Sequence, residues 1–180
     1  MQIVVPSLGR CGSTVVAEAL RDAFPELPYS FVRHPNGFPE AGVIKTHCWA
    51  PRKLNENSLY VYVYGDPVIA AISAHQQPLD FLRLHYMHMG GSLHLWRFWD
   101  VEDTLHLREN YMSWGAHYPA KNLLFLHYER VFNPAGQDEL SQFVGRSVRI
   151  PERAPRSTVF DPANPQHVNA ERTYADIIKV

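Results

Sequence analysis

The chain has only two cysteines and no long apolar run, and its charges nearly cancel. Two thiols, Cys11 and Cys48, offer no disulfide framework and do not have the spacing of a metal site. No segment approaches the roughly 18 consecutive apolar residues of a membrane-spanning helix, and the N-terminus has the pattern of a strand and loop rather than a signal peptide. A formal net charge of −1 argues against a general polyanion binder, which needs a basic excess. We therefore expect a cytoplasmic protein that binds neither membranes nor nucleic acids.

The length and composition are those of an ordinary globular domain. With 180 residues, 46% of them hydrophobic and 19% charged, the chain can bury a full core. We expect one domain over residues 1–180, in which about the last 30 residues are rich in loops and proline.

The most informative stretch is the first twenty residues. Residues 2–6 have the apolar pattern of a short strand, residues 7–14 are small and glycine-rich, and an amphipathic helix follows from Thr14. A strand, a tight loop and a helix N-terminus make an anion site, because loop N–H groups converge there and the helix dipole adds positive potential. Arg10 brings a guanidinium to the same place. The stretch predicts a cradle for phosphate or sulfate, with a merely tight connection as the alternative.

This loop lacks the lysine of the usual nucleoside-triphosphate loop. Aligning Gly12 and Thr14 with the end of G-x-x-x-x-G-K-[ST] places Ser13 where the lysine belongs and Ser7 where the first glycine belongs. An ATP-dependent kinase or hydrolase would lose its β/γ-phosphate cation at that position. The loop is therefore expected to bind an anion, but not ATP in the usual way.

Strands and helices alternate along the rest of the chain. This predicts an α/β fold with three layers, a parallel sheet flanked by helices, of the P-loop nucleotide-binding type. In such sheets ligands bind beyond the carboxyl ends of the strands, so the residues that follow each strand matter most. The expected strands are residues 2–6, 29–33, 42–46, 59–64 and 122–127, and the expected helices begin at Thr14, Pro67 and Pro134 or span 101–118 and 170–178. The residues expected to cap helices are Asp66, Asp100 and Asn133 at the start and Gly145 at the end.

A second motif, Lys45-Thr46-His47, follows one of these strands. Alternation at a strand end places Lys45 and His47 on the same face, about 7 Å apart. Imidazole suits removal of a proton from a hydroxyl near neutral pH, and a cation beside it stabilises developing negative charge. Alone, the motif is more typical of a surface lysine and a structural histidine. Its position after a buried strand, where Arg10 arrives from the first loop, favours the functional interpretation.

These motifs resemble those of the sulfotransferases that use 3′-phosphoadenosine-5′-phosphosulfate (PAPS). Residues 10–14 (RCGST) resemble the P-[KR]-S-G-[ST]-T loop that cradles the 5′-phosphosulfate in that family, and residues 45–47 match its K-T-H motif, which supplies the catalytic base. Residues 62–73 resemble its Y-x-x-R-[DN]-P-x-x-x-x-x-S segment, which grips the 3′-phosphate. Residues 123–131 resemble a later strand that ends in Tyr-Glu. Several weak motifs in the same order are together fairly specific.

The resemblance implies a donor and a set of roles. PAPS would be the co-substrate, no metal would be required, and the acceptor would be a small molecule or saccharide with a hydroxyl or amine. His47 would be the general base, with Lys45 and Arg10 stabilising charge. The residues expected to bind the donor are Arg10, Cys11, Gly12, Ser13, Thr14, Gly65 and Ser73.

One position departs from the family pattern. Gly65 stands where the third segment has the arginine that grips the 3′-phosphate, and Arg153 or Arg156 is a candidate to replace it. Such an arginine makes charge-assisted bonds worth roughly 1.5–3 kcal/mol each, so its loss should weaken discrimination for a 3′-phosphorylated donor. Two alternatives stay open: a non-catalytic nucleotide-binding protein, and a kinase-like phosphotransferase in which Asp66 and Thr14 hold Mg²⁺.

Residues 77–99 are rich in aromatic side chains and histidine. The histidines around 86–94 have no recognised metal-ligand spacing. The aromatic residues predict a lid or acceptor pocket, with ordinary core packing as an equal alternative.

Overall fold

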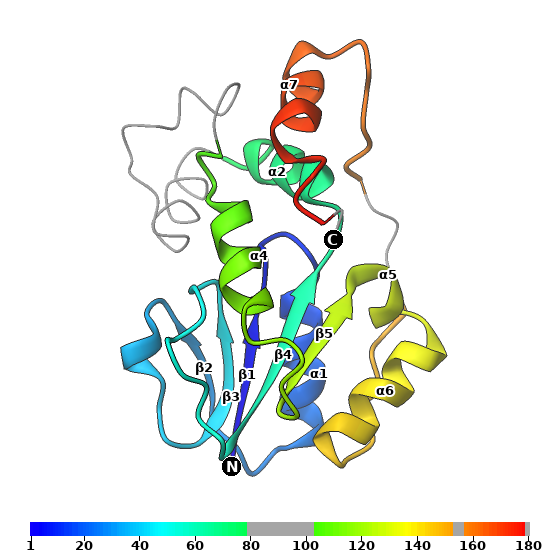
Figure 1. The fold of residues 1–180 in the computed structure, drawn as a ribbon. Coiled ribbons are helices and arrows are strands. Elements are labelled where there is room, and N and C mark those ends of the chain that lie inside the picture. Colours follow the sequence, from blue (N-terminus) through cyan, green and yellow to red (C-terminus); the bar gives the residue numbers. More distant parts are fainter. Residues whose placement is uncertain (79–102, 153–156, 179–180) are drawn as a thin grey trace.

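Five parallel strands form one sheet in a computed structural model of the chain, which describes residues 1–78, 103–152 and 157–178 (Figure 1). The strands are β1 (Gln2–Pro6), β2 (Tyr29–Val32), β3 (Gly42–Thr46), β4 (Ser58–Tyr64) and β5 (Leu123–His127). Their order across the sheet is β2-β3-β1-β4-β5. All five predicted strands are confirmed, with ends that differ by at most one residue. Because β1 is the central strand, the loop that follows it leaves from the middle of the carboxyl edge.

The central strands are apolar because both of their faces are covered. Ile3 and Val5 belong to one buried cluster, whereas Val4 between them belongs to the other, as the alternation of side chains along a strand requires. In β4, Val61 joins the first cluster and Tyr62 the second. Burial on both faces is typical of parallel sheets and explains the continuous apolar runs in the sequence.

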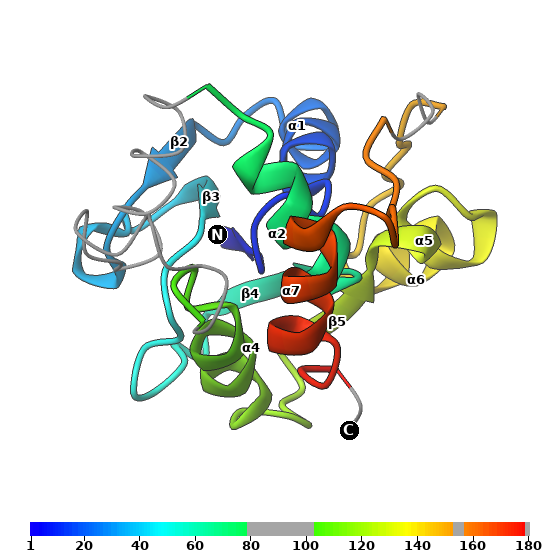
Figure 2. The ribbon, with the colours of Figure 1, turned by 90° about the horizontal axis from the view of Figure 1, so that it is seen from above.

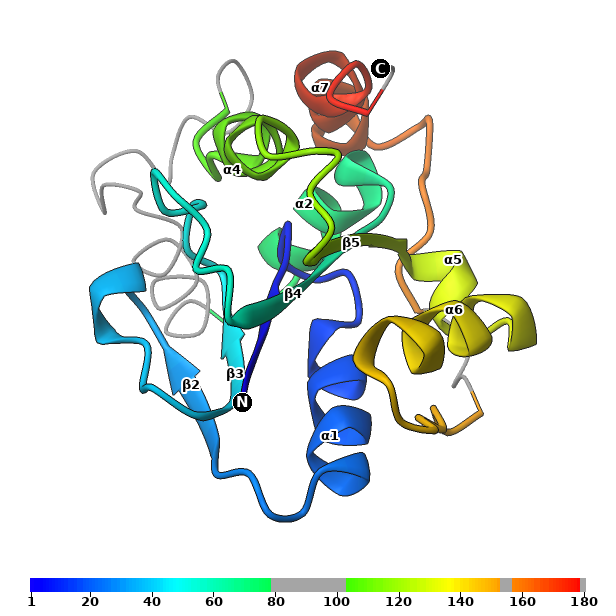
Figure 3. The same cartoon turned by 60° about the horizontal axis from the view of Figure 1, so that its bottom comes forward.

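The helices surround this sheet on both faces and at its carboxyl edge. They are α1 (Ser13–Ala23), η1 (Pro35–Gly37), α2 (Pro67–His75), α4 (Leu107–Gly115), α5 (Tyr128–Val131), α6 (Pro134–Val144) and α7 (Pro165–Tyr174). Helices α1 and α6 lie on one face and α4 on the other (Figure 3). Helices α2 and α7 pack against each other beyond the carboxyl ends of the strands (Figure 2). The predicted three-layer α/β fold is confirmed, and none of the helices described is both long and apolar enough to cross a bilayer.

Predicted capping residues mark the start of α2 and both ends of α6. The Oδ1 atom of Asp66 accepts hydrogen bonds from the backbone N–H groups of Val68 at 2.8 Å and Ile69 at 3.1 Å, which fixes the start of α2. The side chain of Asn133 caps α6 in the same way. Gly145 ends α6 with a φ of 71°, a left-handed conformation that glycine adopts at little cost.

The helix predicted over 101–118 begins later than expected. It is α4, which starts at Leu107, and the carboxylate of Asp103 accepts hydrogen bonds there from the N–H groups of Leu107 and Arg108. The expected cap, Asp100, lies outside the described residues. Either aspartate fits the sequence pattern of a cap, so the pattern alone did not locate the start of the helix.

The last helix also differs from its prediction over 170–178. Helix α7 spans Pro165–Tyr174, and the side chain of Asn164 accepts a hydrogen bond from the N–H of Gln166. Pro165 occupies the first helical position, where its missing N–H has no helical partner to lose. A proline that favours a loop in the sequence therefore starts a helix in the structure.

Gly136 provides a test of how α5 and α6 pack. A Cβ added at Gly136 would lie 2.0 Å from the carbonyl oxygen of Arg130. Because that oxygen belongs to the backbone of α5, the helices would have to move apart, and we expect Gly136→Ala to destabilise the fold by about 1–3 kcal/mol. The matched control is Gly115→Ala in α4, where an added Cβ meets no atom within 4 Å. Denaturant unfolding should show the control at or above wild-type stability, and equal stability of both variants would contradict the packing.

Candidate functional site

The loop between β1 and α1 turns sharply at the carboxyl edge of the sheet. Gly9, Arg10 and Gly12 have φ values of 86°, 52° and 78°, and this left-handed region favours glycine. Among the described residues no side chain caps α1 at Gly12, and the first turn of α1 holds no acidic residue. Its N–H groups and the positive end of the helix dipole therefore suit a bound anion. Ser13 and the exposed Thr14 are the first two residues of this helix.

Tyr128, the first residue of α5, packs against this loop. A Cβ added at Gly12 would lie 2.7 Å from Tyr128 Cε2, and one added at Gly65 would lie 3.0 Å from Tyr128 Cβ and 3.5 Å from Cys11 Sγ. Cys11 is buried, and its thiol donates a hydrogen bond to the carbonyl oxygen of Gly9 at 3.0 Å. The thiol of Cys11 is thus engaged inside the loop, and Gly65 is a close-packed position against it.

His47 follows β3 and shares a hydrogen bond with Ser7, which follows β1. The Oγ atom of Ser7 lies 2.8 Å from His47 Nδ1 and 3.0 Å from Ser13 Oγ, and it accepts a hydrogen bond from the N–H of Gly9 at 3.3 Å. The exposed fractions are 0% for Ser7, 3% for Ser13 and 7% for His47. A buried chain of hydrogen bonds therefore joins the imidazole to the first residue of α1.

The pairing of Ser7 with His47 was missed in the sequence, although the strand register explains it. Strands β1 and β3 are parallel neighbours in which Pro6 pairs with Thr46. The next residue of each strand then lies beside the other at the carboxyl edge. That signal needs the strand order, which the linear pattern of apolar runs does not contain.

Two cations and a hydroxyl approach the same edge. The Nε atom of Arg10 donates a hydrogen bond to Ser73 Oγ of α2 at 3.2 Å. Burial lowers the pKa of Lys45; Glu18 raises that pKa in part, and the positive charge of Arg10 lowers it. The Lys45 ammonium also lies 5.4 Å from the ring centre of Phe31, its pairing partner on β2. The structure thus joins Arg10 to Ser73 and places Lys45 close enough to Arg10 for their charges to interact.

Side chains of α4 and β4 hold the segment that carries His47. Asn110 Nδ2 donates hydrogen bonds to the carbonyl oxygens of His47 at 3.0 Å and Cys48 at 3.2 Å, and Trp114 Nε1 donates to the carbonyl of Cys48 at 3.0 Å. The hydroxyl of Tyr62 donates to Asn110 Oδ1 at 2.8 Å. These bonds fix the backbone at His47 independently of its ring. No motif marks Asn110, because its partners lie 62 and 63 residues away in the chain.

An aromatic side chain lies against the imidazole. The ring of Phe31 meets the His47 ring edge-on with centroids 5.9 Å apart. Trp49 lies two residues beyond His47 in the chain, and its ring centre is 6.0 Å from that of His106. Phe31 and Trp49 are 38% and 43% exposed, which is high for large apolar side chains. The predicted lid or acceptor pocket, residues 79–102 in particular, lies outside the described residues, as do Arg153 and Arg156.

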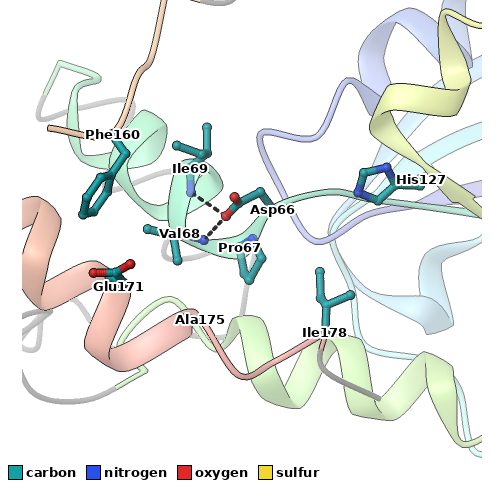
Figure 4. Close-up of a pocket in the computed structure, with 9 residues that line it drawn as sticks. All are labelled: Asp66, Pro67, Val68, Ile69, His127, Phe160, Glu171, Ala175 and Ile178. Carbon is teal, nitrogen blue, oxygen red and sulfur yellow. Dashed lines mark hydrogen bonds between the residues drawn. The ribbon is translucent and has the colours of Figure 1, made fainter. Parts of the chain in front are cut away.

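A cavity of about 370 Å³ lies beside the start of α2 and is acidic (Figure 4). Asp66, Glu171 and His127 contribute its polar side chains. No residue of the 7–14 loop is among the described residues that line it, and its carboxylates disfavour a phosphate. Asp66 is engaged as the cap of α2, and the described residues contain no cluster of three or more side chains suited to a metal ion.

Comparisons with known proteins find similarity at the level of structure. No family model and no curated protein matches the sequence. Mouse sulfotransferase SULT7A1 complexed with PAP matches with a TM-score of 0.54 and 19% identity, over 82% of this chain and 59% of that one. This chain has a sulfotransferase fold.

Retinol dehydratase, solved with PAP and either androsterone or retinol, has the same sulfotransferase fold. The two structures match with a TM-score of 0.52 and identities of 16% and 14%, over 98% and 96% of this chain. Each match covers 64% of the retinol dehydratase chain. The present chain therefore spans about three fifths of the length of these neighbours.

Proposed function

We propose that this protein is a sulfotransferase that moves a sulfuryl group from PAPS to the hydroxyl or amine of a small-molecule acceptor. The observation that carries the proposal is the buried Ser13–Ser7–His47 chain at the carboxyl edge of a sulfotransferase fold, with Arg10 in the same loop and Lys45 two residues before His47. The solved neighbours of this fold hold PAP, the bisphosphate that remains after PAPS gives up its sulfuryl group.

The donor would be held at its 5′ end by the first loop. The backbone N–H groups of Gly12, Ser13 and Thr14 lie at the N-terminal end of α1, where the helix dipole is positive. The guanidinium of Arg10 adds a fixed positive charge, which forms stronger bonds to phosphate and sulfate oxygens than a neutral donor does. Cys11 would contribute through its backbone, since its thiol is bonded within the loop.

The 3′ end of the donor would lie near Ser73. The family arginine at this end is replaced by Gly65, which is packed against Tyr128 and Cys11. A different cation is present here, because Arg10 donates a hydrogen bond to the hydroxyl of Ser73. This contact supports recognition of a 3′-phosphate in spite of the glycine.

The chemical step would be an in-line transfer. The acceptor oxygen or nitrogen forms a bond to sulfur while the bond from sulfur to the bridging phosphate oxygen breaks, and PAP leaves. His47 takes the proton that the acceptor loses. Arg10 and Lys45 stabilise the negative charge that develops on the bridging oxygen and the transferring group.

The acceptor would contact the apolar rim beside His47. Phe31 offers exposed aromatic surface there, which suits a ligand with an apolar body and one reactive polar group. The androsterone and retinol bound to retinol dehydratase are molecules of this kind. A small organic acceptor is therefore favoured over a saccharide.

Calorimetry with three nucleotides tests the donor. We expect adenosine-3′,5′-bisphosphate (PAP) to bind with equal affinity with and without Mg²⁺, and more tightly than AMP, because the site offers cations and N–H groups for both phosphates. ATP should bind weakly, because Ser13 stands where the usual loop has its lysine. ATP binding that requires Mg²⁺ and exceeds that of PAP would instead favour the kinase-like alternative.

A further inference from the structure

The hydroxyl of Ser7 occupies a position where its single proton has two possible acceptors. Ser7 Oγ lies 2.8 Å from His47 Nδ1 and 3.0 Å from Ser13 Oγ. A serine hydroxyl donates one hydrogen bond and accepts two. The N–H of Gly9 already occupies one acceptor position of Ser7. Ser7 can therefore donate to only one of its two other neighbours and must accept from the other.

The two arrangements differ in which imidazole nitrogen carries the proton. When Ser7 donates to Ser13, His47 must donate through Nδ1–H, and its Nε2 is then the basic nitrogen. When Ser13 donates to Ser7, Ser7 donates to Nδ1, and the proton of the neutral ring is on Nε2. Only the first arrangement leaves Nε2 able to accept a proton from a substrate.

The same two arrangements differ at the anion loop. In the first, the hydroxyl proton of Ser13 is not used by Ser7 and can be donated to an oxyanion at the start of α1. In the second, that proton points to Ser7, and Ser13 presents only lone pairs to an anion. The three groups are at most 7% exposed, so bulk water does not readily replace any of these bonds.

We propose that Ser7 is a positioning residue that couples the loop to His47. An oxyanion bound at Ser13 selects the arrangement in which His47 carries its proton on Nδ1 and is basic at Nε2. The bound donor thereby raises the population of the tautomer that is basic at Nε2 above its population in the empty protein. The link to catalysis rests on the proposed sulfotransferase function, whereas the link between an anion and the tautomer does not.

Nitrogen NMR of the imidazole rings tests this coupling directly. Long-range ¹H–¹⁵N spectra distinguish the two neutral tautomers, and the signals of His47 are identified by comparison with His47→Gln. At about pH 8, above the ordinary imidazole pKa of about 6.5, we expect both neutral tautomers in the free protein and a rise in the population of the Nδ1–H form on addition of PAP. Inorganic sulfate, which has no nucleotide, should produce the same shift at higher concentration.

Two serine variants separate the coupling from simple binding. In Ser13→Ala the acceptor hydroxyl for Ser7 is missing, so His47 should stay in the Nε2–H form although PAP still binds. In Ser7→Ala the tautomer should no longer respond to PAP, and kcat should fall roughly 10-fold or more with little change in the KM for PAPS. Ser7→Thr keeps the hydroxyl and should restore both the response and the rate.

The outcomes distinguish this inference from the proposed function. A His47 ring whose tautomer populations do not change while PAP or sulfate is bound overturns the coupling, as does an Nδ1–H form that is already fully populated in the free protein. Failure of PAP to bind in calorimetry, with a shift still caused by sulfate, overturns the donor assignment and leaves the coupling intact. A response to neither anion overturns the coupling as well.

Discussion

Replacement of His47 with alanine should abolish sulfuryl transfer and leave PAP binding nearly unchanged. The imidazole is the group that takes the proton of the acceptor, and general-base catalysis contributes on the order of 10²- to 10⁴-fold to a rate. The donor, in contrast, would be held by the loop at residues 7–14 and by Ser73. We expect kcat to fall by about that factor at saturating PAPS, while calorimetry with PAP gives a similar affinity for variant and wild type.

The backbone conformation near His47 should be unchanged in His47→Ala. Asn110 holds the carbonyl oxygens of His47 and Cys48 through its amide, and these bonds do not involve the imidazole. The control is His34→Ala, which removes an exposed imidazole near the end of β2 and should leave kcat unchanged. Equal turnover of His47→Ala and wild type would show that the base is another group.

The fold followed from local patterns wherever one pattern had one structural solution. Short apolar or aromatic stretches between turns predicted all five strands, and Asp66 and Gly145 correctly marked helix ends because each offers the backbone a bond or conformation that few residues supply. The predicted start of α4 was wrong because the position of this start depends on tertiary contacts. Asn110 and Trp114 must reach the carbonyl groups after β3, and that requirement is invisible in the local sequence.

The candidate site could be predicted in part for the same reason. Arg10 and Ser73 lie 63 residues apart and were selected from separate motifs, and the structure joins them by a hydrogen bond. Ser7 and Asn110 were not selected, although both bond to His47. Their contacts depend on strand order and on the face that α4 covers, which are consequences of packing rather than of spacing along the chain.

Arg10→Ala should cause the largest loss of donor affinity. The guanidinium is the fixed charge in the loop, and charge-assisted bonds contribute roughly 1.5–3 kcal/mol each. Loss of two such bonds, 3–6 kcal/mol in all, weakens PAP binding by at least about 100-fold. Arg10→Lys keeps the charge but loses the planar fork that binds two oxygens at once, so it should lie between the alanine variant and wild type.

The ratio of PAP to AMP affinity shows which phosphate Arg10 serves. Because Arg10 Nε bonds to Ser73 Oγ, we expect Arg10→Ala to weaken PAP more than AMP, which lacks the 3′-phosphate. Ser73→Ala should also weaken PAP binding more than AMP binding, but by a smaller factor, since it removes a neutral hydroxyl. Equal losses for PAP and AMP in Arg10→Ala would confine Arg10 to the 5′ end.

A double-mutant cycle makes the test independent of Gly65. If Arg10 and Ser73 hold the same phosphate, the loss of PAP affinity in the double variant should differ from the sum of the single losses, whereas their AMP losses should add. Additive PAP losses would mean that the two side chains act on different parts of the donor. Non-additive losses would mean that Arg10 of the first loop supplies the positive charge that the family pattern places at position 65. Arg10 would then serve both ends of the nucleotide.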